Sequence, residues 1–225
     1  MLIRHPKSWY NEKHRIAWSK DVWLCDFWSY SLTKMSEYVR WKFSGSKIYS
    51  GTLLRCRELV DVFISNNDNV TVYYNSQLNE RDFGIYANHS KTQIINLLQK
   101  KFPKDTAGNN FSAWMDKDWL GFESNEELQN RIWWVLTSVL EEEKDSDCII
   151  IPIHTWTGRI ILSRIMDVLP KDLDRVLWSH KLYNLWISEF EYKQGIWTRD
   201  HTKINYIPDE LRELFTMEEQ KELYT

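Results

Sequence analysis

Apolar positions recur along the chain with two different spacings, and these predict alternating strands and helices. Short apolar or β-branched runs predict strands over residues 1–4, 47–50, 70–75, 148–154, 184–192 and 196–200. Apolar residues three and four positions apart predict helices over 31–43, 51–66, 91–102, 124–143, 157–169 and 208–223. Ser124, followed three residues later by Glu127, forms a capping box that marks the start of the clearest helix.

This order of elements predicts the fold class. Strands that alternate with helices are typical of a parallel sheet covered on both faces. We therefore expect an α/β protein, a three-layer sandwich whose central sheet is mostly parallel with helices on both faces. The 225 residues contain no internal repeat and no Pro/Gly/Ser-rich linker, so we expect a single domain over 1–225. The residues Lys-Gln-Gly at 193–195 predict a hairpin turn between two late strands.

Composition and charge narrow the class of protein. The formal net charge of −3 gives no basic field over the whole molecule, so we expect no nucleic-acid partner. The sequence shows neither a membrane-spanning run nor a signal-peptide pattern, and we expect a cytoplasmic protein with no membrane partner. The odd count of three cysteines, without CxxC spacing, disfavours a disulfide framework or zinc site. We expect no metal and no cofactor; the oligomeric state stays open, with a homodimer as one alternative.

Two histidines directly follow predicted strands. His5 follows the apolar run MLIR, and His154 follows CIIIPI. Ligands of open α/β sheets bind beyond the carboxyl ends of the strands. If the two strands are neighbours, both imidazoles project into one crevice.

Four ordered segments carry a family resemblance. They are LIRHPKSWYNEKHR, SGTLLRCRELV, LNERDFG and IIIPIHTWTGR. In this order and spacing they resemble the histidine phosphatase superfamily, with its phosphoglycerate mutase-like fold, over roughly residues 1–200. The chain departs from the family pattern at Pro6 and Thr155, which stand where the family has a glycine after each motif histidine.

The resemblance implies a role for each polar residue in these segments. His5 is the expected nucleophile, which forms a phosphohistidine, while Glu80 is the expected general acid and later the base. His154 is expected to complete the catalytic centre as a further donor. The expected phosphate-binding residues are Arg4, Arg55, Asn11 and Ser8. The arginines supply planar, permanently charged donors to phosphoryl oxygens, and Asn11 and Ser8 add uncharged polar groups. The candidate substrate contacts are Lys91, Arg15 and Trp18.

Three functions are compatible with this centre. We favour a metal-independent phosphatase for a small phosphorylated metabolite or nucleotide; Trp114 and Trp119 suggest a flat or apolar leaving group. A phosphoglycerate-type mutase is an alternative, because Lys91 follows LNERDFG at the spacing of the substrate-contacting lysine in the mutase branch. Against it, residues 103–121 lack the adjacent arginine pair with which mutases hold the substrate carboxylate. The changes at Pro6 and Thr155 leave a second alternative, an inactive relative that binds phosphate or a protein.

Overall fold

The computed structural model describes most of the chain. The described residues are 1–17, 20–26, 29–43, 45–65, 69–109, 111, 114, 120–144, 148–167, 182–193, 195–198 and 203–214. The main sheet has five strands in the order β3-β2-β4-β1-β5. Their bounds are β1 (Leu2–Arg4), β2 (Lys47–Ser50), β3 (Thr71–Tyr74), β4 (Ile149–Ile153) and β5 (Ile187–Ser188). Only β5 pairs antiparallel in this sheet, which confirms the mostly parallel α/β fold.

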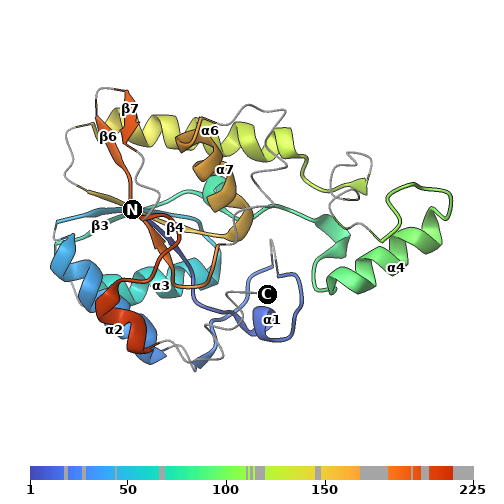
Figure 1. Ribbon diagram of the computed structural model, residues 1–225, viewed down its shortest axis with the longest axis horizontal. Helices are drawn as coiled ribbons and strands as arrows, with labels where there is room; N and C mark the ends of the chain where they lie inside the picture. Colours follow the sequence, from blue (N-terminus) through green and yellow to red (C-terminus); the bar gives the residue numbers. More distant parts are fainter. Residues whose placement is uncertain are drawn as a thin grey trace.

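Helices cover both faces of the sheet, and this confirms the three-layer arrangement (Figure 1). In that view α2 (Ser29–Lys42) and α3 (Leu54–Ser65) lie below the sheet, while α6 (Asn125–Glu142) and α7 (Thr155–Ile165) lie above it. The helix α4 (Lys91–Lys101) projects at one end, and the short α1 (Trp9–Glu12) follows β1. The described residues also include the 3-10 helices η2 (Ser76–Leu78), η3 (Gly84–Tyr86) and η7 (Asp209–Leu214).

The central strands bury both of their faces. Leu2 packs into the core on the α6–α7 side, while its neighbour Ile3 packs into the core on the α2–α3 side. In β4, Ile151 likewise packs on the α6–α7 side and Ile150 on the α2–α3 side. Successive side chains of a strand point to opposite faces, so a continuous apolar run is what a doubly covered strand requires.

A proline lies in the central strand β4, where a ladder would normally need an N–H donor. Pro152 pairs with Ile3 of β1, but β2 pairs with β4 only at Ile149 and Ile150. The strand β2 therefore ends its pairing before Pro152. The same register places Arg4 opposite Ile153, so β1 and β4 end side by side.

The C-terminal part differs from the sequence prediction. The strand expected over 184–192 is divided: β5 joins the main sheet, and β6 (Glu191–Lys193) forms a separate hairpin with β7 (Ile196–Thr198). Leu185 has a φ of 61°, a left-handed conformation that a continuous strand cannot contain. The helix expected over 208–223 is a 3-10 helix at Asp209–Leu214, and its later part lies outside the described residues.

Two predicted elements agree closely with the structure. The strand over 47–50 has the predicted bounds, and α6 begins with the predicted capping box of Ser124 and Glu127. Helix α7 begins at Thr155, two residues before the predicted start, directly after His154. This earlier start places the backbone N–H groups of the residues after His154 in the first turn of a helix, where their hydrogen-bond partners come from outside the helix.

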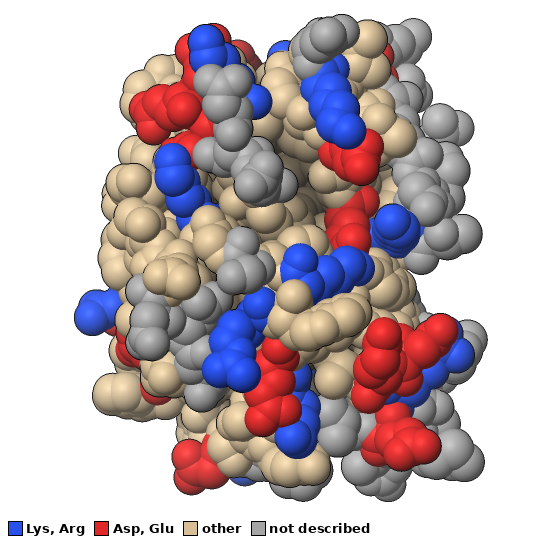
Figure 2. Space-filling view, turned by 90° about the vertical axis from the view of Figure 1, so that its left-hand side faces the viewer, with Lys and Arg blue, Asp and Glu red and all other residues tan. Residues whose placement is uncertain are grey.

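The surface agrees with the nearly balanced charge. Figure 2 shows lysine and arginine intermixed with aspartate and glutamate on the face it displays. Within the part of the chain that the structure describes, no helix combines the length and apolar character needed to cross a membrane.

Candidate active site

The two histidines meet at the carboxyl ends of β1 and β4. The ring centroids of His5 and His154 lie 5.1 Å apart, and both side chains are buried. Parallel pairing continues one residue beyond the strands, because the His5 N–H donates to the Ile153 carbonyl at 3.2 Å. The two strands are therefore neighbours, which the sequence left open, and the imidazoles share one site.

The hydrogen bonds of His5 identify its tautomer. Nδ1 lies 2.6 Å from the carbonyl oxygen of Pro6, which can only accept a hydrogen bond. The proton of a neutral ring must therefore be on Nδ1, and Nε2 carries the lone pair. Asn184 anchors the backbone from the other side, since its Nδ2 donates to the His5 carbonyl at 2.7 Å. His5 thus presents an orientated, nucleophilic ring nitrogen.

His154 has the opposite tautomer. The Nε–H of Arg55 donates to Nδ1 of His154 at 3.1 Å, so the ring proton is on Nε2. That nitrogen lies 3.4 Å from the Sγ of Cys56, the residue beside Arg55 on α3. A second guanidinium nitrogen of Arg55 donates to the Lys20 carbonyl at 3.0 Å, which fixes the plane of the guanidinium.

Both imidazoles are kept neutral. Burial lowers the pKa of His5 well below its usual value near 6.5, and the charges of Arg55 and Arg4 lower it further. Burial, then Arg55, then the neighbouring His5 lower the pKa of His154 in the same way. A neutral ring keeps the lone pair that a nucleophile needs, so the surrounding cations prepare His5 for attack.

Arg4 brings an unsatisfied cation to this site. One of its terminal nitrogens donates to the Leu182 carbonyl, but its Nε is buried and has no hydrogen-bond partner among the described residues. The pKa of Arg4 is lowered to about 10, mainly by burial. The negative charge of Glu80 raises this pKa, whereas the positive charges of Arg159 and Arg55 lower it further. A buried donor without a partner is costly and rare in native proteins. An anion bound beside Arg4 would satisfy it.

Glu80 lies at the start of α7. Its carboxylate accepts hydrogen bonds from the Trp156 N–H at 3.0 and 3.3 Å and from the Thr157 N–H at 3.4 Å. The Arg81 N–H donates to it at 3.0 Å. Amide donors at a helix N-terminus attract anions, and here the chain's own carboxylate uses them. Glu80 is buried, and its charge acts on Arg4 and Arg55.

Two further cations lie beside this centre. Burial lowers the pKa of Arg159 to about 10, and its guanidinium lies 5.4 Å from the ring centroid of Trp156. Desolvation and the charge of Arg159 lower the pKa of Lys91, whose Nζ lies 5.9 Å from the ring centroid of Phe111. The structure therefore brings Lys91 near Arg159, and Arg159 near Arg4.

Three predicted site residues make hydrogen bonds of their own. Ser8 caps α1, and its N–H and hydroxyl donate to the side-chain oxygen of Asn11 at 3.0 and 2.9 Å. Ser8 is buried and Asn11 is half-buried. Arg15 is exposed and donates to Asn88 at 3.1 Å. In the structure Ser8 and Asn11 thus form a capping box, and Arg15 lies on the surface.

Trp114 does not offer the expected flat surface for a leaving group. Trp114 is fully buried in the core, and its indole N–H donates to the Gly108 carbonyl at 2.9 Å. The expectation for Trp114 is therefore wrong, because the ring packs against other apolar side chains. Trp18 and Trp119 lie outside the described residues.

Several residues that shape the site were not predicted. Cys56 contacts His154, and Asn184 holds the His5 backbone. The side-chain oxygen of Asn79 accepts hydrogen bonds from the N–H groups of Thr52 and Leu53, at 2.7 and 3.3 Å, just before α3 begins. These residues act through contacts between distant segments, which leave no local pattern in the sequence; the place of Cys56 next to Arg55 was the one available signal.

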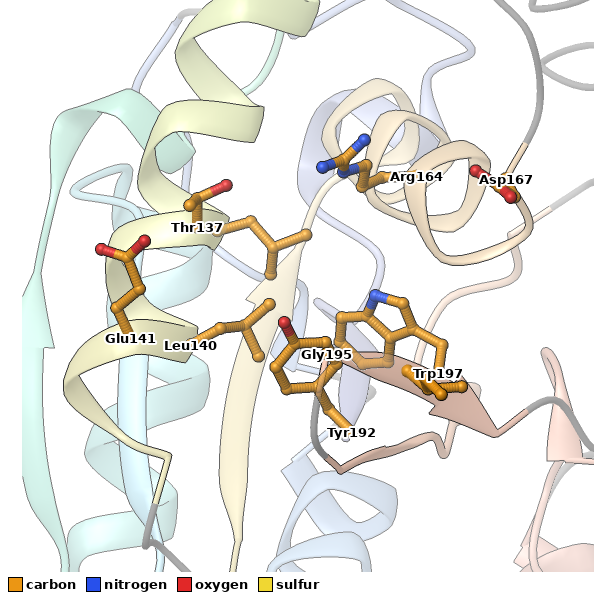
Figure 3. A pocket seen from close by; sticks show the side chains of 10 residues that line it. Thr137, Leu140, Glu141, Arg164, Asp167, Tyr192, Gly195 and Trp197 are labelled. Carbon is orange, nitrogen blue, oxygen red and sulfur yellow. The ribbon is translucent and has the colours of Figure 1, made fainter.

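A cavity lies away from the histidines. It has a volume of about 410 Å³ and lies between α6, α7 and the β6–β7 hairpin, with Arg164, Tyr192 and Trp197 in its wall (Figure 3). The predicted site residues are not among the described residues that line it. Over the described residues, no group of three or more His, Cys, Asp or Glu side chains is placed to hold a metal ion.

The mostly parallel sheet, with helices on both faces and two facing imidazoles beyond its strand ends, has a phosphoglycerate mutase-like fold. More narrowly, the chain belongs to the histidine phosphatase superfamily (branch 1), whose family description matches residues 1–205. No curated protein matches the chain.

Solved structures share this fold at low sequence identity. Bacillus stearothermophilus YhfR has a TM-score of 0.73 and 17% identity, over 88% of this chain and 92% of its own. The alpha-ribazole phosphatase from Shigella flexneri has a TM-score of 0.72 and 18% identity, over 91% and 95%. A phosphoglycerate mutase from Bacillus anthracis has a TM-score of 0.71 and 17% identity, over 88% and 89%.

Proposed function

We propose that the protein hydrolyses phosphomonoesters through a phosphohistidine at His5. The observation that carries this proposal is the buried Nε of Arg4, which lacks a partner among the described residues beside a neutral, orientated His5. Arg4 and Arg55 supply positive charge where a phosphoryl group develops negative charge on its non-bridging oxygens. His154, whose ring faces His5, adds a further donor to the same oxygens when its Nε2–H turns from the Sγ of Cys56 toward them.

In the first step, Nε2 of His5 attacks phosphorus in line with the leaving oxygen. The P–N bond forms while the P–O bond to the alcohol breaks. Glu80, as the general acid, donates a proton to the departing alkoxide. The product of this step is a free alcohol and a phosphorylated His5.

In the second step, Glu80, now ionised, takes a proton from water. The water oxygen attacks phosphorus, the P–N bond breaks, and its electron pair returns to Nε2 of His5. Inorganic phosphate then leaves. Two displacements at one phosphorus replace a single attack by water, which is a weaker nucleophile than a positioned imidazole. The step uses charges of the protein itself, so we expect turnover to persist in EDTA.

The substrate we propose is a small phosphorylated metabolite or nucleotide that carries a second negative charge. The charge of Arg159 acts on both Lys91 and Arg4, so a second anionic group beside the phosphate would meet further positive charge. A carboxylate or second phosphate would bind there through charge-assisted hydrogen bonds.

The test compares wild type with His5→Ala on p-nitrophenyl phosphate, and on a panel of phosphorylated metabolites, nucleotides and phosphopeptides. We expect hydrolysis by wild type, loss by the variant, and acid-labile label on His5 after a quench with radiolabelled substrate. Equal activity in both proteins would exclude the nucleophile. Activity in neither would favour a phosphate-binding relative, and interconversion dependent on 2,3-bisphosphoglycerate would favour a mutase.

A further inference from the structure

The general acid of the proposed reaction sits on an irregular segment. Residues 79–83 follow η2 without regular secondary structure, so hydrogen bonds from other elements must hold Glu80 in place. Arg131 of α6 supplies them. One of its terminal nitrogens donates to the carbonyls of Gln77 and, at 2.9 Å, Asn79. The other donates to the Glu80 carbonyl at 3.2 Å.

Glu123 holds this guanidinium in turn. Its two carboxylate oxygens accept from Nε of Arg131 and, at 2.9 Å, from the same terminal nitrogen that reaches Glu80. The Asp82 N–H also donates to the Glu123 carboxylate, at 3.0 Å. Only 17% of the Arg131 side chain and 13% of the Glu123 side chain are exposed. Such a bidentate pair is geometrically specific, which a lysine cannot reproduce.

The backbone of Glu123 adds two more bonds to the segment. Its N–H donates to the Asp82 carbonyl at 2.8 Å, and its carbonyl accepts from Nε of Arg81 at 2.7 Å. Arg131 and Glu123 therefore make hydrogen bonds to the segment on both sides of Glu80.

We propose that Arg131 and Glu123 are positioning residues that place the Glu80 carboxylate for proton transfer. With its backbone held, Glu80 reaches the Trp156 and Thr157 N–H groups at the start of α7. Thr157 returns the contact, since its hydroxyl donates to the Asn79 carbonyl at 3.0 Å. Because α7 begins directly after His154, the ion pair couples the position of the acid to that of the second histidine. This inference rests on the proposed function for the role of Glu80.

The first test uses leaving groups of different quality. p-Nitrophenolate leaves without a proton, whereas an alkoxide, as from glycerol 2-phosphate, needs one. The rate to compare is that of the first step, measured as alcohol release in a single turnover, because hydrolysis of the phosphohistidine is common to both esters. We expect Arg131→Lys and Glu123→Gln to lower this rate for the alkyl ester about 100-fold. We expect the first-step rate for p-nitrophenyl phosphate to change by no more than about threefold, and Glu80→Gln should show the same selectivity in this step. Arg164→Lys, an exposed arginine on α7, is the matched control and should leave both rates unchanged.

Equal losses on both esters, in proportion to a lowered melting temperature, would show a merely structural role and overturn the inference. If Glu80→Gln lacks the selectivity, the assignment of the acid fails, and the inference fails with it. Loss of the alkyl ester alone in both Glu80→Gln and Arg131→Lys supports it.

The second test does not depend on activity. Amide hydrogen exchange should show that the Trp156 and Thr157 N–H groups lose at least tenfold protection in Arg131→Lys, while core amides of β4 keep theirs. Unchanged protection would overturn the inference even in an active enzyme. Lost protection in a protein that hydrolyses no ester would support the positioning role and contradict the proposed hydrolysis.

Discussion

The rings of His5 and His154 lie 5.1 Å apart in opposite tautomers, although more than half of the chain separates them in sequence. Pro6 holds the proton of His5 on Nδ1, and Arg55 holds the proton of His154 on Nε2. One ring therefore offers a lone pair and the other offers a donor. This asymmetry is what attack on a phosphoryl group and stabilisation of its oxygens require.

We predict that Arg55→Met raises the pKa of both imidazoles. After burial, the charge of Arg55 is the main cause that lowers these values, so removing it favours the protonated rings. NMR titration of His5 and His154 between pH 5 and 8 checks this, with Arg57→Met, an exposed neighbour on α3, as control. We expect Arg55→Lys to lower kcat/KM about 10²- to 10³-fold. Unchanged titration in Arg55→Met would contradict the proposed electrostatic coupling.

The stability of the protein should fall as the pH falls below about 6.5. Above this pH the imidazoles are neutral in both the folded and unfolded states, and stability is full. Below it the unfolded rings take up protons that the buried rings, with their lowered pKa, do not. For each ring, the free energy of unfolding should decrease by up to about 1.4 kcal/mol for every pH unit below this value. Urea unfolding at several pH values measures this slope; a variant with His5→Gln and His154→Gln should show a shallower one.

Gly158→Ala should destabilise the fold near the site. A Cβ at this position would lie 2.6 Å from Cδ1 of Leu182 and closer still to Cδ1 of Ile153. We expect a loss of about 1–3 kcal/mol from overpacking. The higher helix propensity of alanine opposes this by about 1 kcal/mol. Thermal and urea unfolding test it against Lys100→Ala, an exposed helical position; a net gain in stability would show that the neighbours give way.

Lys91→Gln should weaken binding of substrates that carry a second negative charge. Loss of one charge-assisted hydrogen bond costs about 1.5 kcal/mol, or roughly a tenfold rise in KM. The KM for p-nitrophenyl phosphate should stay within about twofold, because that ester has no second anionic group. Lys100→Gln on the same helix is the control. Equal effects on both substrates would place Lys91 at the phosphate itself.

The local pattern of the chain was sufficient for most of the architecture. Continuous apolar runs such as residues 149–153 can only be buried on both faces, and this requires covering helices. The capping box at Ser124 is a local hydrogen-bonding pattern, and it appears as predicted. The strand expected over 184–192 was wrong because φ at Leu185 depends on how that segment meets β1.

By itself, then, the sequence determined the alternation of strands and helices and the ends of the strands at His5 and His154, because periodicity and breakers act over a few residues. Only the tertiary structure decided that β1 and β4 are neighbours, which tautomer each imidazole adopts, and that Arg131 reaches Glu80. These features depend on hydrogen bonds and packing between residues far apart in the chain, for which no local spacing exists.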